Sequence, residues 1–307
     1  MKTFEVDAKA QPLVKWVGGK RQLQEIILSK MPAKFSTYFE PFLGGGAMFF
    51  RLSPTESVLS DLNAGLMNLY KCVKSEPESV ESAATEIALQ FNGLSTEEQE
   101  AFFLALRTEY NTVPREGVRQ ASVFLFLNRA GFNGMYRENQ TGEFNIPFGR
   151  MDRVNLFESG NLKAVSAMLQ KATLFHASFE EVLDKSFSKP AKKGDLVYLD
   201  PPYIPISKTS SFTSYTKENN SSADQIELQN KISLVIQDLT SRGVGVVLSN
   251  SAAGLSTSLF ETKLGMHKQE LEVTRLISGL SKGRARVTEL VLWNDIVQKA
   301  QDEKLPR

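Results

Sequence analysis

The sequence predicts an α/β fold in which a mostly parallel sheet carries an inserted, mainly helical unit. Short apolar runs of strand length recur along the chain, and the first of them is followed by three glycines. A long stretch with helical spacing separates the early strand-like runs from the late ones. The chain has 307 residues, of which 41% are apolar and 23% charged. This size suits one large α/β domain with a smaller appended unit.

The predicted sheet begins at residues 38–42, a short apolar and aromatic stretch that leads into the glycines at 44–46. The apolar segment 47–52 then indicates a helix, so the order is strand, glycine turn and helix. Residues 56–61 form the next strand-like run, which ends in Asp61. This arrangement is typical of nucleotide-binding folds, where an acid after the second strand suits the hydroxyl pair of a ribose.

Helical spacing continues from about residue 76 to 127 and is broken at 114–117. The segment 129–149 is rich in asparagine, glycine and aromatic residues, which predicts a hairpin with loops. We expect the charged tail from Lys299 to fray. The remaining predicted elements are strands at 172–176, 195–199 and 243–249, a helix near 223–242, and a terminal antiparallel pair at 266–273 and 286–293.

Cysteine and histidine usage excludes several kinds of site. Cys72 is the only cysteine, and His176 and His267 are the only histidines. We therefore expect no disulfide framework, no metal site and no Cys/His or Ser/His nucleophile system, and we assign these three residues to packing. The start of the chain lacks the apolar stretch of a signal peptide, and the longest apolar runs have strand length. These features predict a cytoplasmic location and no membrane partner.

Charge alone does not identify a partner. The formal net charge is +1, which gives no overall attraction to a polyanion. Between residues 107 and 153 there are seven arginines, five acids and no lysine. Arginine suits bidentate contacts to phosphates and bases, but the same composition is typical of a solvated helical face.

The segment Asp200-Pro201-Pro202-Tyr203 directly follows the predicted strand 195–199, at the edge where α/β sheets place their sites. The Asp200 carboxylate can accept a hydrogen bond from an aromatic amine, and the prolines leave backbone carbonyls as further acceptors. Two acceptors on one amine favour a pyramidal nitrogen whose lone pair can attack a sulfonium methyl group. Tyr203 offers a face for a base taken out of a duplex. Taken alone, the four residues would equally suit a strand end followed by a turn.

Four motifs follow one another along the chain. They are Lys15-Trp16-Val17-Gly18-Gly19-Lys20-Arg21, Phe39-Glu40-Pro41-Phe42-Leu43-Gly44-Gly45-Gly46, Ser60-Asp61-Leu62-Asn63 and Asp200-Pro201-Pro202-Tyr203. In this order they resemble the Dam-type DNA adenine-N6 methyltransferases, and the resemblance covers nearly the whole chain. The segments 145–150, 204–207 and 211–216 are most similar to the GATC-specific modification methyltransferases of type II restriction-modification systems.

This resemblance implies a Rossmann-like, S-adenosylmethionine-dependent methyltransferase sheet with an inserted, mainly helical target-recognition domain. The catalytic and cofactor-binding domain would comprise residues 1–72 and 160–300, and the recognition domain residues 73–159. The implied reaction is methyl transfer from S-adenosyl-L-methionine to a flipped adenine in double-stranded DNA, with GATC as the expected target. Pairing with a restriction endonuclease and a solitary role both stay open, and we expect a monomer or weak dimer.

The resemblance also implies which residues form the catalytic and cofactor sites. Asp61 would take the ribose hydroxyls and Lys20 would meet a carboxylate. Ser178, beside Phe179, stands where related modification enzymes can carry an acid. The implied catalytic residues are Asp200, Pro201, Pro202 and Tyr203. The implied cofactor-binding residues are Trp16, Lys20, Phe42, Gly44, Gly46, Asp61, Phe179 and Asp200.

The segment 129–137 resembles the DNA-reading hairpin of that family. Phe132 would act as a wedge, Phe132 or Asn133 would fill the space left by the flipped base, and Arg137 would read a guanine. Without the family, a β-turn with a surface arginine would be the better interpretation. The implied DNA contacts are Arg129, Phe132, Asn133, Met135 and Arg137 in the hairpin, and Lys282 and Arg284 in a loop near the phosphates.

Three other functions compete with this interpretation. A nicotinamide-dependent oxidoreductase shares the strand, glycine turn and following acid, but the glycines at 44–46 lack its usual spacing. Enzymes that methylate RNA or a protein glutamine often carry asparagine in place of the aspartate, whereas this chain has Asp200 and a long insertion. A binding module that has lost catalysis would not need the Asp200 loop intact.

Overall fold

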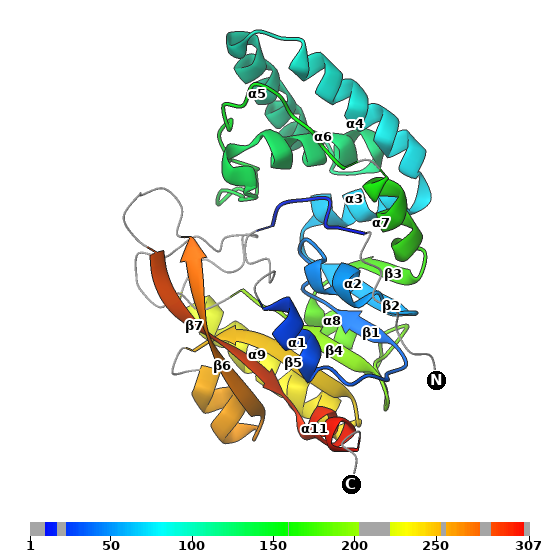
Figure 1. The fold of residues 1–307 in the computed structure, drawn as a ribbon, viewed down its shortest axis with the longest axis vertical. Coiled ribbons are helices and arrows are strands. Elements are labelled where there is room, and N and C mark those ends of the chain that lie inside the picture. Colours follow the sequence, from blue (N-terminus) through cyan, green and yellow to red (C-terminus); the bar gives the residue numbers. More distant parts are fainter. Residues whose placement is uncertain are drawn as a thin grey trace.

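The computed structural model describes residues 10–16, 23–158, 160–202, 222–252, 256–276 and 284–303. Its centre is a seven-stranded sheet with the order β3-β2-β1-β4-β5-β7-β6 (Figure 1). β1 to β5 run parallel, whereas β7 is antiparallel to both of its neighbours. The α/β prediction is thus confirmed. The strands are β1 (Tyr38–Glu40), β2 (Ser57–Asp61), β3 (Ala172–His176), β4 (Leu196–Leu199), β5 (Gly245–Ser251), β6 (His267–Leu276) and β7 (Arg284–Trp293).

Helices cover both faces of the sheet, because alternate strand residues point to opposite sides. In β4, for example, Leu196 and Tyr198 join one core while Val197 and Leu199 join the other. The first face packs against α1 (Gln24–Lys30), α2 (Ala47–Leu52), α3 (Ala64–Ser75), α7 (Asn161–Leu169) and α11 (Asp295–Asp302). The second face packs against α8 (Phe179–Leu183), α9 (Ser222–Ser241) and the π-helix η2 (Thr257–Lys263).

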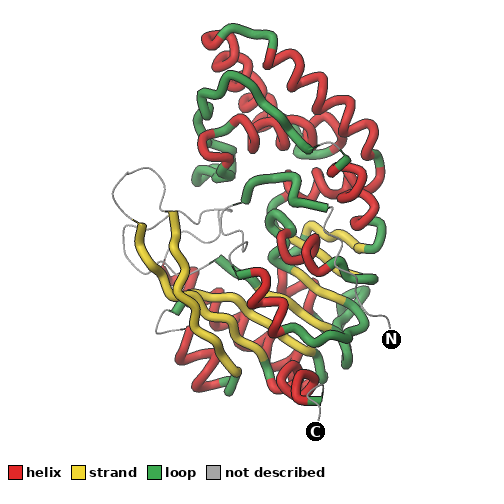
Figure 2. Tube along the Cα trace, viewed as in Figure 1, coloured by secondary structure: helices red, strands yellow, loops and turns green. Residues whose placement is uncertain are grey.

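The inserted unit is helical, as predicted, and extends away from the sheet (Figure 2). It contains α4 (Pro77–Asn92), α5 (Thr96–Thr112) and α6 (Gly117–Ala130). Pro77 lies in the first turn of α4, where its missing N–H costs no hydrogen bond. A capping box between Ser95 and Glu98 starts α5. α3 packs on both β3 and α6, and it therefore joins the inserted unit to the sheet.

The segment after α6 folds back on itself. Residues 131–149 contain the short 3-10 helix η1 (Phe132–Gly134) and two isolated bridges, which pair Gly131 with Phe148 and Glu138 with Phe144. We call residues 131–149 the recognition hairpin, after the DNA-reading role that the sequence resemblance implies for residues 129–137. The predicted hairpin began at residue 129, which is wrong: α6 runs through Ala130, because the apolar run before it is buried on every side as one continuous helix.

The C-terminal end of the described chain also differs from the prediction. Lys299, expected to lie in a frayed tail, is inside α11. Asn294 starts this helix by accepting a hydrogen bond from the Val297 amide, and Val297 is buried against the sheet. The cap and one buried apolar contact therefore order a segment that looks merely charged in the sequence.

Residues 10–16 lie between the sheet and the helical unit, where Figure 1 draws them in dark blue. The buried Asn128 side chain of α6 accepts a hydrogen bond from the Lys15 amide at 2.9 Å and donates to the Lys15 carbonyl at 2.9 Å. It also donates to the Gly134 carbonyl at 3.2 Å. Asn161 of α7 binds both backbone groups of Gln11 in the same way, at 2.8 and 3.0 Å. Two side-chain amides thus hold this segment against the helices.

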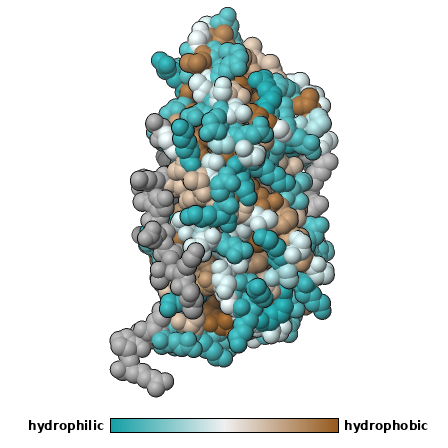
Figure 3. All heavy atoms as spheres, turned by 90° about the vertical axis from the view of Figure 1, so that its right-hand side faces the viewer, coloured by the Kyte–Doolittle hydropathy of each residue, from teal (hydrophilic) through white to brown (hydrophobic). Residues whose placement is uncertain are grey.

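The face that Figure 3 shows is mostly hydrophilic, with hydrophobic side chains in smaller groups among the polar ones. One of the exposed apolar residues of the described chain is Leu89 on α4. Scattered apolar side chains are ordinary on a face in contact with water. Among the described helices, none combines the length and apolar character that crossing a membrane requires.

Replacing Asn128 with alanine is expected to lower the free energy of unfolding by about 2 kcal/mol. The substitution leaves three backbone groups, at Lys15 and Gly134, without their partner in a buried position. Asn155→Ala, at an exposed position, is the matched control and should change stability by less than about 0.5 kcal/mol. Urea titrations of both variants measure the difference, and equal midpoints would contradict the role given to Asn128.

Candidate active site

Three acids meet at one edge of the sheet. Asp61 ends β2, Glu40 ends β1 and Asp200 directly follows β4. These strands are neighbours and run parallel, so their carboxyl ends face the same way. Asp200 and Asp61 both act on the Glu40 carboxyl electrostatically, which places the three groups in one region. This edge is where open α/β sheets bind their ligands.

The glycine turn after β1 closes onto Asp61. Gly44 and Gly46 have φ values of +47° and +70°, a left-handed conformation that suits glycine. The Gly44 amide donates to one oxygen of Asp61 at 2.8 Å, and the Asn63 amide donates to the other at 2.9 Å. Burial raises the pKa of Asp61, and these backbone donors oppose that shift. Asp61 therefore fixes the turn and retains further lone pairs for a ligand.

Asn63 adds an unused donor beside Asp61. Its side-chain oxygen caps α3 by accepting from the Leu66 amide at 2.9 Å. The side-chain Nδ2 is buried and has no hydrogen-bond partner among the described residues. A buried donor without a partner is costly, so this position suits a ligand that brings an acceptor. The prediction named Asp61 only, although Asn63 belongs to the same motif.

Aromatic side chains border the glycine turn on two sides. A Cβ atom placed on Gly44 would lie 2.8 Å from Cδ1 of Trp16, so the indole packs directly on the turn. The rings of Phe42 and Phe179 stack with their centroids 5.2 Å apart. The structure thus brings together seven of the eight predicted cofactor residues, namely Trp16, Phe42, Gly44, Gly46, Asp61, Phe179 and Asp200. Lys20 and Tyr203 lie outside the described residues.

Glu40 is a site residue that the sequence interpretation missed. Its side chain is 2% exposed and accepts a hydrogen bond from the Tyr38 hydroxyl at 2.8 Å. Burial raises the pKa of Glu40 to about 8, the Tyr38 hydrogen bond opposes the shift, and Asp200 adds to it. Glu40 therefore keeps its proton at neutral pH. An acid that ends an apolar strand run was the available signal.

The strand that precedes Asp200, β4, is held to its neighbour β5 by a side-chain contact. The Tyr198 hydroxyl lies 2.8 Å from the hydroxyl of Ser249 on β5. Burial raises the pKa of Tyr198 well above its usual value, and the Asp200 charge adds to this effect. Pro201 is buried and Pro202 half-buried. Asp200 thus stands on a fixed support at the centre of the sheet.

Ser178 has a structural task in this fold. Its hydroxyl accepts from the Glu181 amide at 3.2 Å, and the Glu181 carboxylate accepts from the Ser178 amide at 2.7 Å. This capping box starts α8, whose first residue is Phe179. The serine at this position therefore orients the phenylalanine that stacks on Phe42.

The predicted DNA-contacting residues divide into two groups. Phe132 is 42% exposed, and Asn133 and Arg137 are also exposed, whereas Met135 is half-buried. Asn133 has a φ of +56°, which asparagine adopts more readily than most residues.

Arg129, by contrast, lies in the last turn of α6 and donates twice to the Leu13 carbonyl, at 3.0 and 2.6 Å. It holds the segment that carries Trp16. Lys282 lies outside the described residues, and Arg284 is described only as the first residue of β7.

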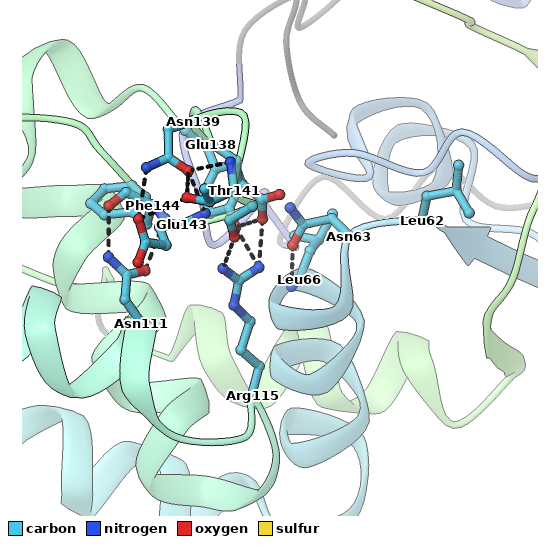
Figure 4. Close-up of polar contacts among 12 residues, drawn as sticks. Leu62, Asn63, Leu66, Asn111, Arg115, Glu138, Asn139, Thr141, Glu143 and Phe144 are labelled. Atoms are coloured by element: carbon cyan, nitrogen blue, oxygen red, sulfur yellow. Dashed lines mark hydrogen bonds and ion pairs between the residues drawn. The ribbon is translucent and has the colours of Figure 1, made fainter. Parts of the chain in front are cut away.

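Figure 4 shows how the recognition hairpin is fastened to the helical unit. Arg115 forms an ion pair with Glu138 and donates to the Gly142 carbonyl. Asn111 of α5 donates to the Phe144 carbonyl and accepts from the Phe144 amide, both at 2.9 Å. Part of the arginine-rich stretch therefore serves the fold. Within the described residues, no group of three or more acids, histidines or cysteines could hold a metal ion.

The stability of the protein is expected to fall as the pH rises from about 5 to 8, relative to Glu40→Gln. A carboxyl with a pKa of about 8 when folded and 4.5 ordinarily binds more protons in the folded state across this window, so raising the pH favours unfolding. The limiting slope for one proton is about 1.4 kcal/mol per pH unit. Glutamine still offers an acceptor to Tyr38 but does not titrate. Denaturant titrations across this pH range measure the difference, and parallel curves would contradict the assignment.

Comparison with known proteins finds relatives that cover most of the chain. A type II methyltransferase of Lactococcus lactis is 36% identical over 293 residues, which cover 92% of this chain and 95% of that protein. A type II methyltransferase of Methanocaldococcus jannaschii is 35% identical over 254 residues, covering 79% of this chain and 85% of that protein. A DNA adenine methylase of Salmonella typhi is 33% identical over 284 residues, covering 92% and 95%.

Among solved structures, a precorrin 8W decarboxylase of Methanobacterium thermoautotrophicum covers 89% of both chains at 13% identity with a TM-score of 0.35, a likeness too low to add to the fold description. The family model of D12 class N6 adenine-specific DNA methyltransferases matches residues 16–275. That range contains Glu40, Asp61 and Asp200, the three acids at the edge of the sheet. The chain belongs to the family of D12 class N6 adenine-specific DNA methyltransferases.

Proposed function

We propose that this adenine-N6 DNA methyltransferase takes its methyl group from S-adenosyl-L-methionine and modifies the adenine of GATC. The observation that carries the proposal is the meeting of Asp200 with the glycine turn and Asp61 at one edge of the sheet. A base-binding loop and a nucleoside-binding turn then face a common space. The stretch 73–159 would form the recognition domain, with residues 1–72 and 160–300 as the catalytic domain.

The residues of the turn fit S-adenosyl-L-methionine. Asp61 has lone pairs free for ribose hydroxyls, and the buried Nδ2 of Asn63 can donate to an acceptor of the ligand. The glycines allow the backbone to approach the ligand closely. Trp16 and the stacked pair of Phe42 and Phe179 supply apolar walls, and Lys20 would meet the carboxylate. When bound, S-adenosyl-L-methionine supplies a methyl group on a positively charged sulfur.

Asp200 and the loop it begins would orient the target adenine. The carboxylate accepts a hydrogen bond from the exocyclic amine, and a backbone carbonyl beside Pro201 or Pro202 accepts a second. These two acceptors turn the nitrogen lone pair away from the ring. Because Glu40 keeps its proton at neutral pH, it adds no second negative charge beside Asp200. Tyr203 would stack on the base.

The recognition hairpin would read the DNA. Phe132 and Asn133 project from its turn and suit the space left by the flipped adenine, and Arg137 suits a guanine in the major groove. Met135 would complete the base contacts, and Lys282 with Arg284 would hold phosphates. For Arg129 we favour a supporting role in place of the DNA contact expected from sequence, because its guanidinium is bonded to the Leu13 carbonyl.

The named relatives support two proposals for the biological setting. Two of them are called type II methyltransferases, so we propose that this enzyme protects DNA against a partner restriction endonuclease and acts as a monomer or weak dimer. The similarity to a DNA adenine methylase favours a solitary role as the second candidate. A gene for a GATC-cleaving nuclease next to the gene of this enzyme would support the first candidate, and its absence would support the second.

The target is tested with radiolabelled S-adenosyl-L-methionine and paired duplexes that differ only in whether GATC is present. Labelled methyl groups should enter only the duplex that contains GATC. This methylation should protect that duplex from a methylation-sensitive nuclease. Equal labelling of both duplexes would overturn the specificity while leaving the methyl donor supported. Failure of both to accept label from this donor would overturn the donor.

Asp200→Asn is expected to lower kcat by a factor of about 100 to 1,000. The substitution keeps the size of the side chain but replaces one strong acceptor with a donor, so the amine is held less well in the transition state. Binding of S-adenosylhomocysteine, measured by calorimetry, should change far less. Asp152→Asn, at an exposed position of the inserted unit, is the matched control. An unchanged kcat in Asp200→Asn would contradict the catalytic role proposed for Asp200.

Arg137→Ala is expected to weaken discrimination at one guanine of the target by roughly 1–3 kcal/mol. Rates on duplexes in which each base pair of GATC is replaced in turn show where the preference is lost. Arg153→Ala, at another exposed arginine of the same stretch, controls for the loss of positive charge. A uniform loss over all duplexes in both variants would identify Arg137 as a phosphate contact.

A further inference from the structure

We propose that Tyr136 is a positioning residue that couples target recognition by the hairpin to cofactor binding at Trp16. The proposal rests on the proposed function, in which Trp16 borders the cofactor and Arg137 touches the target. Tyr136 lies between the two sites, next to Trp16 in space and to Arg137 in the chain, and belongs to neither site. Tyr136 is 3% exposed, so it cannot itself reach DNA in this conformation.

The two aromatic rings form the contact between the sites. Trp16 and Tyr136 stack with their centroids 5.3 Å apart and their planes 19° from parallel. The same side chain also packs on the glycine turn, where an added carbon on Gly44 would lie 2.8 Å from the indole Cδ1 and one on Gly45 would lie 3.1 Å from Cβ of Trp16. Trp16 therefore touches the recognition hairpin and the cofactor turn at once. A shift of Tyr136 changes the packing of Trp16 on the turn.

Tyr136 in turn follows the hairpin closely. Its hydroxyl donates to the Glu138 carboxylate at 2.6 Å and accepts from Arg115 at 3.3 Å. Its ring contacts those of Phe124 and Phe144 at 5.3 and 5.5 Å. These partners include residues from both sides of the recognition hairpin, since Glu138 and Phe144 form an antiparallel β-bridge. The ring is therefore packed between the hairpin and α6.

The chain places Tyr136 directly before Arg137. Successive residues here alternate, with Tyr136 buried and Arg137 exposed, so a base contact at Arg137 acts on the backbone that carries the buried ring. Asn128 meanwhile fixes the backbone at Lys15 and Gly134. With the backbone beside Trp16 tethered in this way, a displacement of the hairpin passes to the indole through the ring stack.

Coupling between two binding sites is reciprocal. If the target duplex tightens cofactor binding by some factor, the cofactor must tighten target binding by the same factor. A factor of about 5 or more lies in the usual range for such coupling. A duplex without the target would engage phosphates but not Arg137, and it should leave the cofactor affinity nearly unchanged.

The test measures the Kd of S-adenosylhomocysteine by calorimetry for the protein alone, with a duplex that the wild-type enzyme methylates, and with a duplex that it does not. In the wild type, only the methylated sequence should tighten binding, by about 5-fold or more. Tyr136→Phe keeps the ring and should retain this factor. Tyr136→Leu keeps an apolar side chain without the stack, and the factor should fall to about one. Phe103→Leu, a buried ring of the same unit that packs on Phe126 and Phe148, should behave like the wild type.

Fluorescence provides a second readout that general destabilisation would not reproduce. The chain has two tryptophans, so Trp293→Phe leaves Trp16 as the only indole emitter. Binding of the target duplex should change its emission, and adding Tyr136→Leu should abolish that change. Retention of the full coupling factor in Tyr136→Leu, or a wild-type factor of one, would overturn the proposal. If methyl transfer remains specific while the factor is one, the proposed function stands and the coupling alone is wrong.

Discussion

Three neighbouring carboxyl groups at a partly buried sheet edge cannot all carry charge without a large electrostatic cost. Parallel strands impose this problem, because β2, β1 and β4 deliver Asp61, Glu40 and Asp200 to the same side. The structure resolves it by giving each acid a different environment. Asp61 receives two backbone amides, and Glu40 is buried beside Tyr38 with a raised pKa. The glycine turn, the cap of α3 and the support under Asp200 all belong to this solution.

The segment that carries Trp16 depends on the inserted helical unit for its position. Residues 10–16 carry Trp16, yet their backbone partners are Asn128 and Arg129 of α6 and Asn161 of α7. A division of the chain at residue 73 therefore separates Trp16 from the helix that positions it. The sheet and the inserted unit are therefore connected through α6 and are not independent modules.

Much of the sheet could be predicted from the sequence because its signals are local. Each buried strand is a short apolar run, and the glycine turn with its following acid is visible without any tertiary contact. Most of the predicted cofactor residues lie together for the same reason. The end of α6 was missed because Gly131 and its aromatic neighbours look like a hairpin, whereas burial of the preceding run continues the helix through Ala130.

The remaining features depend on contacts between distant residues, which no local pattern reports. Asn128 looks like any helix-end asparagine until Lys15 is found beside it. Arg129 resembles a surface cation, and only the Leu13 carbonyl shows its task. Glu40 lies within one of the four motifs, but its pKa depends on the depth of its burial and on Asp200. Sequence therefore located the site more readily than it explained how the site is held.

The hydrogen bonds that hold residues 10–16 against α6 and α7 also set an order of events during synthesis. Lys15 leaves the ribosome 113 residues before Asn128, and Gln11 leaves it 150 residues before Asn161. At ordinary elongation rates this delay is on the order of ten seconds. Throughout that time the backbone next to Trp16 lacks the side chains of α6 that hold it in the folded protein. Residues 10–16 can therefore reach their folded position only after α6 has been made.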